Sequence, residues 1–172
     1  MAHLLPIAAC ALICLAGCAH TTPVAKTSPT VASPLHGIAL SDDIRKICKI
    51  EDTERTPRFD FDSANLSGTD REVLLQVAHC LTTGPLRGHG VELVGRADPR
   101  GELEYNMTLG TSRAAEVDKY LTTLGVNPLQ LSTTSRGELD ATGTDESGWQ
   151  RDRRVDMRLS APVSVSVLTQ DE

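Results

Sequence analysis

The sequence predicts an α+β domain, a sandwich in which helices cover one face of a small mixed sheet in the order β-α-β-α-β-β. Short stretches in which apolar residues alternate with polar ones recur along the chain. Stretches with apolar residues three and four positions apart lie between them, and Gly and Pro separate the two kinds. The 172 residues, 40% of them hydrophobic, suffice for one domain with a single core, so helices and sheet must share it.

The first half of this domain contains two predicted helices and one strand. Residues 41–50 begin with a capping serine and favour a short helical turn. The stretch RFDFDS, residues 58–63, alternates phenylalanines with charged residues and predicts the first strand. Thr69-Asp70-Arg71-Glu72 fits a capping box, followed by a helix over about residues 70–83.

The second half repeats the pattern with shorter connections. Residues 90–97 read as a strand, and a second helix with one apolar face ends at Gly125. Residues 129–137 and 154–160 predict the third and fourth strands. The tail, residues 161–172, alternates as an edge strand does, and a frayed terminus is the alternative. The apolar face of the second helix consists of Ala114, Val117, Leu121 and Leu124.

The N-terminal segment differs in composition from the rest of the chain. Leu4 to Cys18 is apolar and uncharged, but its about 15 residues are fewer than the roughly 20 that a helix needs to cross a bilayer. We therefore expect residues 1–17 to form a signal peptide. Residues 18–38, rich in Thr, Ser, Ala and Pro, predict a flexible tether in front of a domain over residues 39–160.

The end of the signal segment, Leu15-Ala16-Gly17-Cys18, resembles the lipobox of bacterial lipoproteins. This resemblance implies cleavage before Cys18 and transfer of a diacylglycerol to its thiol. Each buried methylene of an acyl chain contributes about 0.8 kcal/mol, so the acylated protein would be stably anchored. Ala19, and not an aspartate, follows Cys18. In this respect the sequence resembles lipoproteins that are sorted to the outer membrane. The alternative is an ordinary secretory signal with an incidental cysteine.

Charge and cysteine content limit the possible partners and the possible metal or disulfide sites. The net charge of -6 and the absence of a Lys/Arg-rich run argue against nucleic acid as a partner. Cys48 and Cys80 are an even pair in the folded region, which favours a disulfide in an oxidising periplasm, with two buried thiols as the alternative. His79 and His89 add no metal-ligand spacing to these cysteines, so we expect no metal site.

A turn with charged residues follows the strand at residues 90–97. Asp98-Pro99-Arg100-Gly101 has good β-turn chemistry, which is by itself a sufficient explanation. Arg113 is expected at the start of the second helix. If residues 101–110 fold back as a loop or irregular helical turn, Asp98 and Arg113 lie side by side and can hold a zwitterion. The carboxylate accepts from an ammonium and the guanidinium donates to a carboxylate. Alternatively, the two side chains simply pair with each other.

Four short motifs occur in order within residues 58–159: Ala-Asp-x-x-Gly, Tyr-Asn-x-x-Leu, Arg-Ala and Arg-Arg-Val. In combination they resemble the OmpA-like peptidoglycan-binding domain, and most closely its peptidoglycan-associated lipoprotein branch. The resemblance implies an outer-membrane lipoprotein, its globular domain in the periplasm, that binds peptidoglycan without catalysis or cofactor. Tol-type envelope proteins are further partners that it suggests.

The resemblance also implies residue roles. Asp98 and Arg113 would hold the amine and the carboxylate of meso-diaminopimelate in the peptide stem of the cell wall. Asn106 would orient the loop or the ligand. Arg154 matches the second arginine of the family's Asn-Arg-Arg motif, and Asp62 would border the pocket.

Two residues depart from the family pattern. Arg96 replaces the histidine usual in the lipoprotein branch, and we expect it to add positive charge beside the pocket. Asp152 replaces an asparagine and should keep the acceptor role while losing an amide donor. Three rival functions remain: a wall hydrolase, for which the histidines lack evident partners; a flagellar stator, for which a charged membrane helix is missing; and a lipoprotein that binds only proteins.

Overall fold

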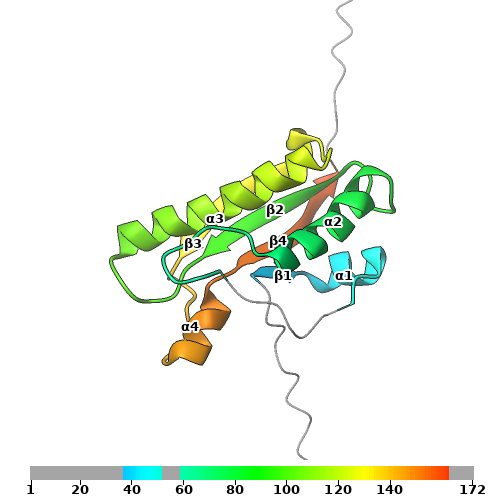
Figure 1. The fold of residues 1–172 in the computed structure, drawn as a ribbon. Helices are drawn as coiled ribbons and strands as arrows, with labels where there is room; N and C mark the ends of the chain where they lie inside the picture. The colour runs from blue at the N-terminus through cyan, green and yellow to red at the C-terminus, as the bar shows by residue number, and fades with distance from the viewer. Residues whose placement is uncertain (1–36, 52–58, 163–172) are drawn as a thin grey trace, which may run out of the picture. The chain divides into compact units, whose positions relative to one another are not determined.

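The computed structural model describes residues 37–51 and 59–162 (Figure 1). The expected signal peptide, the lipidated Cys18, most of the tether and the tail beyond residue 162 lie outside the described residues. The elements in chain order are β1 (Ile38–Leu40), α1 (Asp42–Cys48), α2 (Gly68–Thr82), β2 (His89–Arg96), α3 (Leu103–Thr123), the 3-10 helix η1 (Pro128–Gln130), β3 (Leu131–Gly137), α4 (Glu146–Asp152) and β4 (Val155–Pro162).

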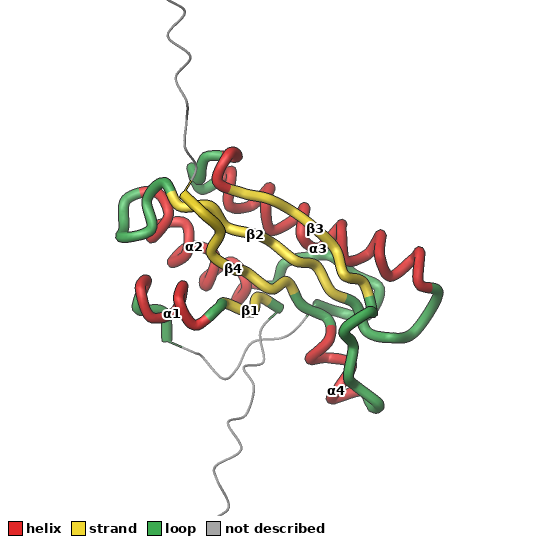
Figure 2. The backbone as a smooth tube through the Cα atoms, turned by 180° about the vertical axis from the view of Figure 1, so that it is seen from behind, coloured by secondary structure: helices red, strands yellow, loops and turns green. Residues whose placement is uncertain are grey.

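The four strands form one mixed sheet in the order β1-β4-β2-β3. β4 runs antiparallel to β2, and the two outer pairs, β1 with β4 and β2 with β3, are parallel. The helices α2 and α3 lie on one face of the sheet, so that in the view from behind the strands stand in front of them (Figure 2). The predicted α+β class, with helices on one face of a small mixed sheet, is confirmed.

The core lies between this face of the sheet and the helices. Because side chains alternate along a strand, Val91 and Leu93 of β2 point into the core together with Val155 and Met157 of β4. Leu74, Val77 and Leu81 of α2 and Ala114, Val117 and Leu121 of α3 complete its centre. The predicted apolar faces of both helices are therefore the buried ones.

α3 approaches the sheet more closely than side chains would allow. A Cβ added at Gly95 of β2 would lie 1.8 Å from the carbonyl oxygen of Gly110, and one added at Gly110 would lie 2.3 Å from the hydroxyl of Ser135. The two glycines thus permit backbone-to-backbone packing of α3 on β2. This contact fixes the height at which Arg113, one turn beyond Gly110, meets the end of β2.

The first strand lies elsewhere than predicted. It is β1, and the described part of the stretch at residues 58–63 is a turn whose Asp62 has a left-handed φ of 56°. Phe59 is buried in the core, whereas Phe61 is 57% exposed, so the two rings do not share a strand face. The carbonyls of this segment accept hydrogen bonds from arginine side chains instead of a neighbouring strand.

The start of α2 was also predicted incorrectly. The capping box consists of Ser67 and Asp70: the Asp70 amide donates to the Ser67 hydroxyl at 3.1 Å, and the Ser67 amide donates to the Asp70 carboxylate at 2.9 Å. Thr69 and Glu72 lie within the first turns of the helix that begins at Gly68. The sequence contains two capping-box patterns, offset by two residues. Only in the pattern that starts at Ser67 does the capping residue precede the first helical residue.

α3 is longer than predicted. Residues 101–110 were expected as a loop or irregular helical turn, but the helix is regular from Leu103 onward, so Arg113 lies near its middle. The early part buries Asn106 and Gly110, which continue the helical spacing of the apolar residues further on. Asn106 and Gly110 are not apolar side chains, so the periodicity of apolar residues did not extend the predicted helix to this part.

The disulfide between Cys48 and Cys80 is confirmed. It joins the last residue of α1 to α2 across a sequence separation of 32 residues. On the chain-entropy model, a loop of this size gives about 3–4 kcal/mol of stabilisation. None of the helices in the described part of the chain is long and apolar enough to cross a membrane.

Candidate ligand-binding pocket

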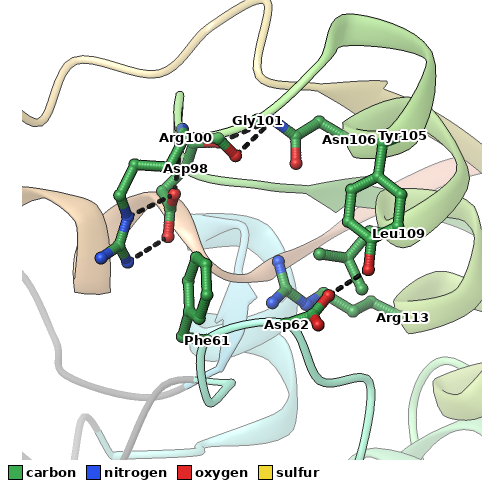
Figure 3. A pocket seen from close by; sticks show the side chains of 9 residues that line it. All are labelled: Phe61, Asp62, Asp98, Arg100, Gly101, Tyr105, Asn106, Leu109 and Arg113. Carbon is green, nitrogen blue, oxygen red and sulfur yellow. Dashed lines mark hydrogen bonds and ion pairs between the residues drawn. The ribbon is translucent and has the colours of Figure 1, made fainter.

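A cavity of about 200 Å³ lies where the end of β2, the start of α3 and the turn at residues 60–63 meet (Figure 3). Its charged lining is two carboxylates and two guanidinium groups, so its formal charge is zero. Four of the five predicted site residues line it, and Arg154 is not among them. The lining consists of Phe61, Asp62, Asp98, Arg100, Gly101, Tyr105, Asn106, Leu109 and Arg113.

Asp98 follows β2 directly and is 3% exposed. One carboxylate oxygen accepts from the amide and Nε of Arg100 at 3.2 and 3.0 Å, and the other accepts from Nη2 of Arg100 at 2.9 Å and Nη1 of Arg153 at 3.0 Å. Burial alone would raise the pKa of Asp98, but the hydrogen bonds from Arg100 and Arg153 outweigh it and lower the pKa. Asp98 is therefore an ionised acceptor at neutral pH.

Arg113 is the largest fully buried side chain of the described residues, with no exposed surface. It donates to three backbone carbonyls: Ser63 at 2.8 Å, Arg96 at 2.7 Å and Asp60 at 3.1 Å. Burial, and next the positive charge of Arg153, lower the pKa of Arg113 to about 10, so the guanidinium stays protonated at neutral pH. Its hydrogen bonds go to carbonyls and not to Asp98, so the expectation that the two residues simply pair with each other is wrong.

A guanidinium carries five N–H groups, and these three hydrogen bonds use three of them. The Arg113 side chain reaches the floor of the cavity, where its guanidinium lies beside Asp62 (Figure 3). Asp98 and Arg113 thus face one cavity with opposite charges while each is held by other partners. This is the arrangement that the sequence predicts, reached from mid-helix instead of from a helix start.

Asn106 positions the turn between β2 and α3. Its amide nitrogen donates to the carbonyls of Asp98 and Arg100, each at 3.1 Å, and to the carboxylate of Glu138. The side chain is 2% exposed, and its amide oxygen points away from the two carbonyls (Figure 3). These contacts favour the role of orienting the loop.

The outer rim of the cavity consists of Asp62, Tyr105 and Phe61. The Tyr105 hydroxyl donates to the Asp62 carboxylate, and this hydrogen bond raises the pKa of Tyr105. Tyr105 and Phe61 are each more than half exposed, at 52% and 57%. The rim therefore offers aromatic surface around a charged interior.

The buried arginine of the Arg-Arg pair is Arg153. It donates to the Phe59 carbonyl at 2.7 Å, to Asp98, and to Glu146 at 3.0 Å. Arg154 donates to Asp156 at 2.7 Å, and so it points away from the cavity. Strand alternation could have found this, because a residue two positions before the core-facing Val155 shares its face.

The two departures from the family pattern act outside the cavity. The Arg96 side chain lies on the opposite face of the sheet, where it donates to Asp156 at 2.8 Å and to Asp140. The expected extra positive charge beside the pocket is thus wrong, and only the Arg96 carbonyl belongs to the site. Asp152 accepts from the amides of Thr142 and Gly143 at 3.2 and 2.9 Å, which keeps the acceptor role that we expected for it.

Sequence reasoning missed the residues around Arg100. Its guanidinium lies between the rings of Phe61 and Trp149, with centroids at 4.2 and 4.3 Å, and it contacts Glu146 at 3.3 Å. Trp149 and Glu146 belong to α4, a helix that was not predicted. Asp145 caps it by accepting from the amide of Gly148 at 2.8 Å. The Asp145 cap was the available signal, but a seven-residue helix with a glycine gives little periodicity.

Helices on one face of a mixed sheet, and a buried carboxylate and guanidinium facing one neutral cavity, define the class of this small α+β domain. The model of the OmpA family matches residues 58–155 of the chain. The chain belongs to the OmpA family.

Several relatives carry the same name. The peptidoglycan-associated lipoprotein of Pseudomonas putida is 42% identical over 102 residues, 58% of this chain and 60% of the relative. That of Pseudomonas aeruginosa is 40% identical over 102 residues, 58% of this chain and 59% of the relative. The match thus spans about 60% of the length of these curated relatives.

Solved structures agree on the fold. The crystal structure of the peptidoglycan-associated lipoprotein from Burkholderia pseudomallei superposes with a TM-score of 0.56 at 35% identity, covering 60% of this chain and 88% of that one. The C-terminal domain of Helicobacter pylori MotB, at 22% identity, has a TM-score of 0.55 over 62% of this chain and 84% of that one, and it supports the fold alone.

Proposed function

We propose that this chain is an outer-membrane lipoprotein that binds peptidoglycan non-covalently through the diaminopimelate of the stem peptide and so links the outer membrane to the cell wall. The observation that carries the proposal is the pair formed by Asp98 and Arg113. Both are buried, both are charged, and both line the same cavity.

This pair suits the free end of a diaminopimelate side chain, which carries one ammonium and one carboxylate on the same carbon. The ammonium donates to Asp98, and the carboxylate accepts from the N–H groups of Arg113 that the three carbonyls leave over. A neutral zwitterion matches the zero formal charge of the lining. Hydrogen bonds between charged groups are strongest where water is excluded, and the burial of both residues favours them.

The state of the charged groups supports binding over catalysis. Asp98 is ionised and held by two arginines, and Arg113 is fixed by three carbonyls. A general acid or base instead needs a pKa near the working pH, and neither group has one. Fixed charges of this kind orient a ligand.

Attachment to the outer membrane rests on the lipobox ending at Cys18 and on the names of the relatives. The tether over residues 18–38 would let the domain reach the wall from the membrane. Tol-type envelope proteins are proposed as additional partners on the family resemblance alone.

A lipoprotein that binds only protein partners is the second candidate. One observation favours it: Arg100 already occupies Asp98, the group on which the ligand ammonium depends. In that case the charged residues around the cavity would serve only to stabilise the fold, and the domain would have no affinity for the cell wall.

Co-sedimentation with purified diaminopimelate-containing sacculi separates the two candidates. The wild type should sediment with sacculi, and Asp98→Asn, which keeps the shape of the side chain, should stay in the supernatant. Asp140→Asn is a matched control, since Asp140 accepts from Arg96 and Arg136 away from the cavity. Equal sedimentation of the wild type and Asp98→Asn would refute the site, and no sedimentation of the wild type would refute peptidoglycan binding.

A further inference from the structure

Four side chains form a closed ring of alternating charge, and two of them, Asp98 and Arg100, line the cavity. Asp98 accepts from Arg100 at 2.9 Å and from Arg153 at 3.0 Å. Glu146 contacts the same two arginines, Arg153 at 3.0 Å and Arg100 at 3.3 Å. Each arginine therefore has two carboxylate partners, and each carboxylate has two arginine partners.

The two arginines of this ring differ in their surroundings. The Arg153 side chain is 5% exposed and also donates to the Phe59 carbonyl, so it is part of the protein interior. The Arg100 side chain is 31% exposed, lines the cavity, and is held on both faces by the rings of Phe61 and Trp149. Of the two arginines, Arg100 is thus the one that a ligand entering the cavity meets.

We propose that Arg100 is an internal substitute for the ligand's ammonium: it neutralises Asp98 in the free protein, and the incoming ammonium displaces it onto Glu146. This inference rests on the proposed function. If Arg100 is displaced in this way, both Arg100 and Glu146 determine the affinity and specificity for the ligand. Glu146 does so without contacting the ligand.

The exchange is physically favourable because Asp98 never loses a cationic partner. A buried carboxylate left without a partner is strongly destabilising, whereas replacing one cation by another keeps it satisfied. Arg100 keeps the Glu146 carboxylate and the two aromatic faces after it leaves Asp98. In Figure 3 the Arg100 guanidinium lies beside both the Asp98 carboxylate and the Phe61 ring.

The exchange also selects the ligand. A compound without a cation cannot take over the Asp98 carboxylate from Arg100, and its own carboxylate would gain only Arg113. Ligands that carry the ammonium and the carboxylate on one carbon gain both contacts. The exchange of Arg100 for the ligand ammonium therefore discriminates against stem peptides in which this amine is missing or acylated.

Two variants have opposite expected effects on affinity. Arg100→Gln removes the competing cation, so the affinity should rise by about twofold to fivefold, the range of a partly exposed ion pair. Glu146→Gln removes the site that receives Arg100, which should then hold Asp98 more firmly, and the affinity should fall by a similar factor. Arg136→Gln on the opposite face of the sheet is the control and should bind as the wild type does.

The test is calorimetric titration of the full chain with the soluble tripeptide L-Ala-D-Glu-meso-diaminopimelate. Trp149, the single tryptophan of the chain, supplies a second readout, because it stacks on Arg100. Its emission should change on binding in the wild type and should not change in Arg100→Gln. Thermal melts of each variant identify losses that arise from unfolding.

Weaker binding by folded Arg100→Gln would overturn the inference, because it would make Arg100 a direct contact of the ligand. Unchanged or tighter binding by Glu146→Gln would overturn it as well. In both cases wild-type binding, abolished by Asp98→Asn, would leave the proposed function standing. Absence of wild-type binding to the tripeptide would overturn the proposed function and the inference together.

Discussion

The guanidinium of Arg113, in the middle of α3, donates at 2.7 Å to the carbonyl of Arg96, the last residue of β2. Asp98 lies two residues beyond that carbonyl. The same arginine that would bind a ligand carboxylate therefore also fixes the strand end that carries the ammonium acceptor. Fold and site share one side chain, and the stability and the affinity of the domain should respond to it together.

Arg113→Lys tests this double role. An ammonium cannot reach all three carbonyls, and the change should lower the free energy of unfolding by about 2–4 kcal/mol because buried acceptors lose their donors. Urea denaturation measures the loss. Arg136→Lys, at an arginine whose side chain is half exposed, should change stability by less than about 0.5 kcal/mol. Equal stability of the two variants would contradict the structural role of Arg113.

Arg153→Gln and Arg154→Gln separate the neighbouring arginines. The first should abolish sedimentation with sacculi and destabilise the fold, since Arg153 holds both Asp98 and the Phe59 carbonyl from a buried position. The second should retain binding, because Arg154 pairs with Asp156 outside the cavity. The reverse ranking of the two variants in a sedimentation assay would show that the wrong arginine is assigned to the site.

Gly95→Ala tests the close packing of α3 on β2. The added methyl would meet the Gly110 carbonyl oxygen at 1.8 Å, and displacing the helix should cost at least about 2 kcal/mol and disturb the height of Arg113. Gly68→Ala is the control, because nothing lies within 4 Å of the added Cβ, and alanine should stabilise α2 by up to about 1 kcal/mol. Thermal melting of both variants provides the comparison, and a neutral Gly95→Ala would contradict the packing.

The pH dependence of stability should report on Asp98. The arginine contacts hold the pKa of Asp98 below its ordinary value of about 4, so the carboxylate stabilises the fold at pH values above that value. This contribution should disappear as the pH falls through the lowered pKa of the folded state. The difference in unfolding free energy between the wild type and Asp98→Asn should therefore shrink towards acid pH, and a constant difference would contradict the lowered pKa.

Patterns along the sequence predicted the elements whose apolar residues face the core. β2, β4 and the second half of α3 were found in this way, because Val91, Val117 and Met157 follow a simple period. The turn at Asp98 was recognised from the chemistry of its residues. The same turn suggested Asp98 and Arg113 as a zwitterion site, and the motif resemblance added Asn106 to the predicted site.

The elements that were misjudged depend on tertiary contacts. The turn at Phe59 and Asp60 is set by arginines that are distant in the sequence, whose hydrogen bonds replace those of a strand. The first half of α3 is set by the packing of Gly110 on Gly95. Arg154 was assigned by motif matching, whereas the alternation of side chains around Val155 would have favoured Arg153.

The most direct test of the central claim compares two soluble muropeptides that differ at one stem residue. Calorimetry of the full chain should show binding of the peptide with meso-diaminopimelate and none with L-lysine at the same position, because lysine supplies the ammonium for Asp98 but no carboxylate for Arg113. Equal affinity for both peptides, or affinity for neither, would contradict recognition of the zwitterion.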